Sequence, residues 1–105
     1  MRIPIKTNWG NEIILSEEDI LTFSELNFNN IKKGTNYESK PYDQIYYIDE
    51  GILKVIISGT TFEWGWSKTF IIKAKVKYQI RPKSIPVRLF RLSFNRKKYE
   101  KFEPK

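Results

Sequence analysis

The sequence predicts one small α+β domain that is mostly β. With 105 residues, of which 40% are hydrophobic and 15% aromatic, the chain is the size of a single domain and too apolar for a disordered basic tail. Short runs with a strand-like period of two recur along it, and one stretch carries helix start signals. We therefore expect an N-terminal hairpin, one helix and then a curved antiparallel meander of four strands, of the kind that forms a small, partly open barrel.

The first element is predicted to be a hairpin. Ile3 and Ile5 alternate with polar residues and Pro4, which suits an edge strand. Residues 8–11 read as a turn, and residues 12–15 as the returning strand.

A helix is predicted over residues of about 17–27. Ser16 is a suitable N-cap, and the three acidic residues that follow it would favour the positive end of the helix dipole. An apolar stripe at helical spacing would cover the core, formed by Ile20, Leu21, Phe23 and Leu26.

The remainder of the chain reads as strands after a polar loop at residues 32–42. Four strands are expected, at residues 44–48, 52–58, 69–81 and 87–95. The globular domain would then span residues 1–95, and residues 96–105 would form a basic C-terminal tail.

Charge divides unevenly along the chain. Residues 1–50 hold five basic and nine acidic side chains, whereas residues 51–105 hold fourteen basic and three acidic ones, and the whole chain has a net charge of +7. Such an asymmetry favours a polyanionic partner. The competing interpretation is that the acidic half folds over the basic half and neutralises it.

Residues 64–67 are interpreted as the tip of a hairpin, because Gly65 stands where a type II′ turn needs a positive φ. This register pairs Leu53 with Tyr78 and Val55 with Val76, and so aligns apolar residues on one face. The other face would then present lysines and two aromatic rings. A bulge near Gly59 would instead move those rings to the first face.

The leading functional prediction is a non-catalytic nucleic-acid-binding domain, DNA or RNA, that contacts backbone phosphates through this basic face. Aromatic side chains at its tip would stack on bases or insert into a groove. The predicted contacts are Lys54, Lys73, Lys75, Lys77, Arg81, Lys83, Arg88, Phe62 and Trp64.

Catalytic and metal-binding patterns are scarce in the sequence. The chain has no cysteine and no histidine, which excludes disulfides, zinc knuckles, thiol catalysis and imidazole bases. We therefore expect no enzyme, metal or cofactor. A nuclease that works without histidine stays open as an alternative, with Glu63, Tyr78, Arg81 and Arg91 as its candidate residues.

A protein-interaction module is the alternative function, for example a regulator or inhibitor from a phage or mobile element that binds a protein partner. The absence of a known nucleic-acid motif motivates it. A homodimer through an exposed sheet edge, at residues 3–6 or 87–95, is also expected. With no apolar run long enough for a membrane span, we expect no membrane contact and a cytoplasmic location, in the host cytoplasm if the chain is viral.

Overall fold

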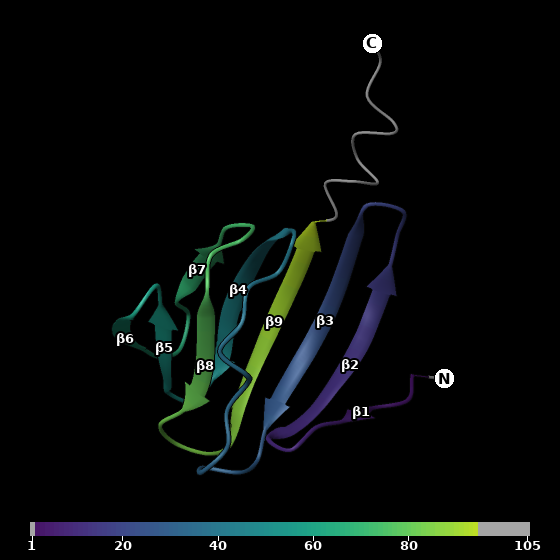
Figure 1. Cartoon of the computed structure of the whole chain (residues 1–105). Helices are drawn as coiled ribbons and strands as arrows, with labels where there is room; N and C mark the ends of the chain where they lie inside the picture. The colour runs from purple at the N-terminus through teal and green to yellow at the C-terminus, as the bar shows by residue number, and fades with distance from the viewer. Residues whose placement is uncertain (1, 95–105) are drawn as a thin grey trace.

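The computed structural model describes residues 2–94, and these residues form only strands, turns and loops. Figure 1 shows the strands as two facing layers. The strands are β1 (Ile5–Lys6), β2 (Gly10–Glu17), β3 (Leu21–Phe28), β4 (Asp43–Glu50), β5 (Leu53–Ile57), β6 (Thr60–Trp64), β7 (Thr69–Ile72), β8 (Tyr78–Pro82) and β9 (Val87–Phe94). The predicted α+β class is therefore wrong, and the described chain is all-β.

The larger sheet has six strands in the order β1-β2-β3-β9-β4-β7, and the smaller sheet has three in the order β6-β5-β8. All neighbouring strands are antiparallel. The predicted N-terminal hairpin is present, with Ile5 opposite Glu12. Strand β9 lies in the middle of the larger sheet, so residues 87–94 offer no free edge for the predicted dimer.

The predicted helix is replaced by the second strand of a long hairpin. Strands β2 and β3 pair from Gly10 opposite Phe28 to Glu17 opposite Thr22. Along β3 the buried residues Ser24, Leu26 and Phe28 recur with a period of two. Only Leu26 of this row belongs to the predicted helical stripe, and Phe23 of that stripe is exposed. Pairing with β2 and β9 on both sides selected the strand. The acidic residues assigned to a helix start lie instead at the end of β2 and in the turn.

The predicted hairpin tip is also misplaced. The chain reverses at Ser58 and Gly59, whose φ angles are 48° and 84°, so that β5 pairs with β6. Two consecutive positive φ angles are the mark of a type I′ hairpin turn. Residues 65–68 instead connect the smaller sheet to the larger one, because β6 and β7 belong to different sheets.

The single strand predicted over residues 69–81 is broken into β7 and β8. The interruption at residues 73–77 contains Lys75 with a φ of 69°. It carries the chain from the larger sheet to the smaller one. Three predicted contact lysines therefore lie in a connection between sheets, not on a strand.

The segment between β3 and β4, residues 29–42, runs along β8 and widens the smaller sheet. Thr35 donates its backbone N–H to the Ile80 carbonyl at 2.9 Å, and Glu38 and Tyr78 form an isolated antiparallel bridge. In Figure 1 this blue segment crosses in front of the strands toward β4. We call it the crossing segment.

The core lies between the sheets and is apolar at one end and polar at the other. Leu26, Phe28, Ile48, Val87 and Leu89 are at most 1% exposed and lie on the inward face of the larger sheet. Further along the same face the inward positions become polar, at Ser24, Gln44 and Arg91, all in β3, β4 and β9. Because polar residues occupy inward positions in three adjacent strands, this end of the sandwich is where we look for a candidate functional site.

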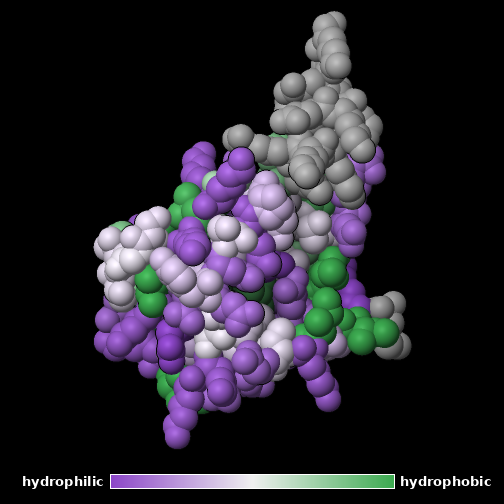
Figure 2. Space-filling view, viewed as in Figure 1, coloured by the Kyte–Doolittle hydropathy of each residue, from purple (hydrophilic) through white to green (hydrophobic). Residues whose placement is uncertain are grey.

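The outer surface of this end is polar as well. Figure 2 shows that the face carrying β8 and the crossing segment is mostly hydrophilic. Within residues 2–94 there is no helix that could cross a membrane.

Candidate functional site

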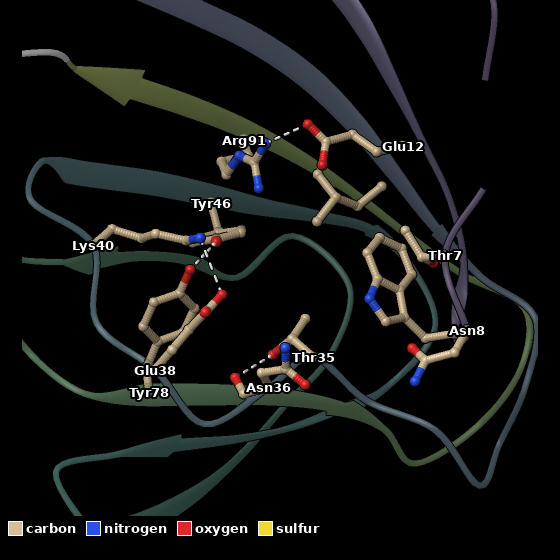
Figure 3. Close-up of a pocket in the computed structure, with 12 residues that line it drawn as sticks. Thr7, Asn8, Glu12, Thr35, Asn36, Glu38, Lys40, Tyr46, Tyr78 and Arg91 are labelled. Atoms are coloured by element: carbon tan, nitrogen blue, oxygen red, sulfur yellow. Dashed lines mark hydrogen bonds and ion pairs between the residues drawn. The ribbon is translucent and has the colours of Figure 1, made fainter. Parts of the chain in front are cut away.

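A pocket of about 400 Å³ lies between the sheets at their polar end. Its size is in the range of about 300–1,000 Å³ typical of small-molecule sites. Strands of both sheets, the crossing segment and the first turn contribute side chains whose polar groups gather around one space (Figure 3). The lining residues are Thr7, Asn8, Trp9, Glu12, Leu26, Thr35, Asn36, Glu38, Lys40, Tyr46, Tyr78 and Arg91.

The inner part of the pocket holds an ion pair between Arg91 of β9 and Glu12 of β2. The Arg91 Nη2 to Glu12 Oε2 distance is 2.5 Å, and the side chains are only 16% and 20% exposed. Burial alone would lower the pKa of Arg91, but the nearby Tyr46 and Glu12 outweigh it and the pKa is raised. Arg91 is therefore a permanent buried cation whose charge Glu12 cancels.

The mouth of the pocket holds a second ion pair, between Lys40 and Glu38 of the crossing segment. Their Nζ to Oε1 distance is 3.0 Å, and their side chains are 33% and 43% exposed. The hydrogen bond to Glu38 raises the pKa of Lys40 against the opposing effect of burial. Glu38 and Lys40 are thus held in place but remain open to solvent and to an entering molecule.

Two tyrosine hydroxyls lie at the wall where the sheets meet. Tyr46 of β4 and Tyr78 of β8 both donate to the Gln44 Oε1 atom, at 2.8 and 3.1 Å, and their hydroxyl oxygens are 3.2 Å apart. All of these groups are buried. With both hydroxyls donating to Gln44, the tyrosine oxygens keep lone pairs, and that of Tyr46 also interacts with the Arg91 side chain.

Stability at alkaline pH provides a test of this network. Burial, with Tyr78 beside it, raises the pKa of Tyr46 well above its ordinary value of 10.0. Above about pH 10 the unfolded chain would lose a proton that the folded chain retains, so the free energy of unfolding should fall as pH rises. Urea denaturation between pH 8 and 11 should show this fall, and Tyr46→Phe should reduce its slope. If the free energy of unfolding fell equally steeply with pH in the variant, Tyr46 would not be the group that keeps its proton in the folded chain.

The predicted basic face is dispersed in the structure. Lys73, Lys75 and Lys77 are exposed in the connection between β7 and β8. Lys54 projects from β5 opposite Glu63 and Arg81. Two other predicted contacts are neutralised, since Lys83 pairs with Glu63 at 2.6 Å and Arg88 pairs with Asp49 at 2.7 Å.

The predicted aromatic tip lies on the inward side of the smaller sheet. Phe62 and Trp64 face Val55 and Leu53 across the β5–β6 hairpin, and Trp64 packs against the core while Phe62 stays 37% exposed at the edge. Their rings stack with centroids 4.8 Å apart, and Trp64 in turn lies 4.9 Å from the buried ring of Phe70. The alternative placement on the apolar face was therefore the correct one.

Of the four residues named for a histidine-free nuclease, the structure brings two together. Tyr78 and Arg91 line the pocket, whereas Glu63 and Arg81 lie on the outer side of the smaller sheet. Sequence reasoning missed Glu12, Glu38, Lys40 and Tyr46. One signal was available, because Arg91 follows Val87 and Leu89 at the next inward position of a buried strand.

Comparisons with known proteins bear on the fold. No family model and no curated protein matches the chain. An RmlC-like cupin from Shewanella frigidimarina superposes with a TM-score of 0.79 at 14% identity, over 93% of this chain and 88% of that one. A cupin superfamily protein from Desulfitobacterium hafniense gives 0.76 at 15% identity, over 89% and 84%. The fold is cupin-like.

Enzymes share this cupin-like sandwich. A salicylate 1,2-dioxygenase from Pseudoaminobacter salicylatoxidans, in adducts with gentisate, superposes with a TM-score of 0.67 at 17% identity. The match covers 72% of this chain but only 20% of the dioxygenase chain. Because cupin-like neighbours include an enzyme, the expectation of a non-catalytic protein is not supported.

The two predicted functions are corrected by the same findings. The similar structures are cupins, and none of those described here points to a nucleic-acid-binding domain or a phage regulator. The geometry agrees, because the predicted phosphate contacts are divided between the smaller sheet, which carries Lys54 and Arg81, and the connection between β7 and β8. Four other predicted side chains are paired with carboxylates or stacked on each other, namely Lys83, Arg88, Phe62 and Trp64. The polar pocket within the sandwich takes the place of that face as the candidate site.

The donor set of the pocket does not fit a resident transition metal. Non-haem iron oxygenases use two histidines and one carboxylate, and this chain has no histidine or cysteine. Both carboxylates of the pocket already form ion pairs with the side chains of Lys40 and Arg91. The described residues contain no group of three side chains that could hold a metal ion. What the lining offers is hydrogen-bond donors and acceptors, together with carboxylates that can take up a proton.

Proposed function

We propose that this chain binds a small polar organic molecule in the pocket between its sheets. The observation that carries the proposal is the convergence of two ion pairs and two tyrosine hydroxyls on one cavity of about 400 Å³. Pockets of this size with a few convergent polar groups are the usual binding sites of small molecules.

Burial at the site supports the proposal further. Three side-chain atoms in β3, β4 and β9 are buried without a hydrogen-bond partner among the described residues, namely Ser24 Oγ, Gln44 Nε2 and Arg91 Nε, and of these residues Arg91 lines the pocket. Such an atom costs roughly 1–3 kcal/mol unless a water or a bound molecule satisfies it, which favours polar occupants at this end. Polar groups kept at such a cost are typical of sites selected for function.

The likeness to the dioxygenase adds a hint on ligand size. Salicylate and gentisate, which are named with that protein, are single-ring molecules. We propose a ligand of comparable size, held by Arg91, Glu12, Glu38, Lys40, Tyr46 and Tyr78.

Ligand-observed NMR with a library of small polar compounds tests the proposal. Asn36 is an exposed lining residue at the pocket, so Asn36→Trp should fill the entrance and weaken binding of any hit by about tenfold or more. The neighbouring Tyr37 is exposed and outside the lining, so Tyr37→Trp is the matched control and should leave binding unchanged. Hits that bind both variants equally would occupy another place, and a library without hits would contradict the proposal.

A further inference from the structure

The charged residues of the pocket cancel one another, although the chain as a whole is strongly basic. The net charge of the chain is +7, yet the lining holds two carboxylates, Glu12 and Glu38, and two cations, Lys40 and Arg91. Each carboxylate is paired with a cation of the same pocket. The pocket therefore offers no excess positive charge to an anion.

The inner ion pair also disfavours an anionic ligand. An anion at Arg91 would either displace Glu12 from its 2.5 Å contact or lie beside that carboxylate. Separating a pair that is only 16% and 20% exposed leaves a largely buried charge without compensation, which is strongly unfavourable. A neutral ligand can contact both members of the pair and leave it intact.

The uncharged groups of the lining can both donate and accept hydrogen bonds. Asn8 and Asn36 supply amide groups, and the Thr7 hydroxyl, which accepts the Gly10 N–H, can still donate. The Thr35 hydroxyl is occupied by the Asn36 carbonyl and the Ile80 N–H, whereas the tyrosine oxygens keep lone pairs for accepting. Carboxylate, guanidinium and amide groups are planar and present two atoms side by side, a spacing that suits two neighbouring hydroxyls. A vicinal diol can form hydrogen bonds with such planar groups, because each of its hydroxyls is both a donor and an acceptor.

An apolar surface completes the lining. Trp9 and Leu26 belong to the pocket, are 7% and 1% exposed, and form part of the core. Aromatic side chains with a polar handle suit ligands that have one apolar and one polar face. The C–H face of a sugar ring is of this kind.

We propose that the ligand is a neutral polyhydroxylated molecule of about monosaccharide size. This inference rests on the proposed function and gives its ligand class. Hydroxyl pairs would contact the Glu12–Arg91 and Glu38–Lys40 pairs, and the ring would lie against the apolar surface.

The test compares neutral monosaccharides with the uronic acids of the same stereochemistry, with binding measured by ligand-observed NMR and calorimetry. Neutral sugars should bind, and their acids should bind no more tightly. Glu38 lies at the mouth, where its side chain is 43% exposed, so the Glu38→Gln variant should fold. The substitution removes one negative charge and gives the pocket a net charge of one positive unit. That variant should raise the affinity of each acid relative to its neutral sugar by about tenfold. Glu12→Gln should do the same at the inner pair.

The outcomes separate the inference from the function beneath it. Acids that bind the unaltered chain at least tenfold more tightly than the neutral sugars would overturn the neutral ligand class, while the small-molecule site would stand. An unchanged acid-to-sugar ratio in both glutamine variants would show that the ion pairs do not set the preference, and would overturn the inference too. Failure of sugars, acids and the polar library alike would reject the proposed function itself.

Discussion

Replacing Arg91 by methionine is expected to lower the free energy of unfolding by about 3 kcal/mol or more. The substitution leaves the Glu12 carboxylate, only 20% exposed, without its cation inside the sandwich. Urea denaturation at pH 7 measures the loss.

The same strand supplies a matched control. Arg88 also lies in β9 and forms an ion pair, with Asp49, but those side chains are 44% and 30% exposed. Arg88→Met should therefore cost much less stability than Arg91→Met, because solvent screens the exposed pair. A double variant, Glu12→Leu with Arg91→Met, should recover much of the loss. Equal costs for the two arginines would contradict the description of Arg91–Glu12 as a buried pair.

Gly51→Ala is expected to have a comparable effect, of about 3 kcal/mol. Gly51 has a φ of 91°, and a Cβ placed on it would lie 2.6 Å from both the Pro86 carbonyl oxygen and the Val87 Cγ2. Part of the cost is the left-handed backbone and part is the contact with a backbone atom that cannot move aside. Thermal or urea unfolding measures the sum.

Gly59→Ala separates the two contributions. Gly59 has a similar φ of 84°, but a Cβ there would have no atom within 4 Å. Its substitution should cost only about 1–2 kcal/mol, the backbone part alone. If the two variants lost equal stability, the close approach of residues 86–87 to Gly51 would contribute nothing to the cost of Gly51→Ala.

The strands were largely predictable from the sequence, but their pairing was not. The short apolar runs at residues 44–48 and 87–95 indicated β4 and β9, and the first turn indicated β1 and β2. The helix was wrong because Leu21, Phe23 and Leu26 fit a helical stripe, whereas the strand buries the alternate positions Ser24, Leu26 and Phe28. Only the partners β2 and β9 decide between the two. The hairpin register was wrong because Ser58-Gly59 and Gly65 are competing turn signals, and sequence alone does not rank them.

The candidate site was hidden by its dependence on distant pairing. Glu12, Glu38 and Arg91 are separated along the chain and become neighbours only when β2, β9 and the crossing segment are arranged around one cavity. Net charge directed attention to exposed lysines, whereas the informative feature was polarity at buried positions. Arg91, Gln44 and Ser24 each interrupt an apolar inward row, and that pattern could be sought in other sequences of this kind.

The crossing segment has a consequence for how such a protein can diversify. It supplies Thr35, Asn36, Glu38 and Lys40 to the lining, yet it belongs to neither sheet as a strand. Backbone bonds such as Thr35 to Ile80 hold it in position, and of its lining side chains Thr35 also accepts the Ile80 N–H. Evolution can therefore exchange Asn36, Glu38 and Lys40 without repacking the core, so that ligand preference and foldability vary almost independently at these positions.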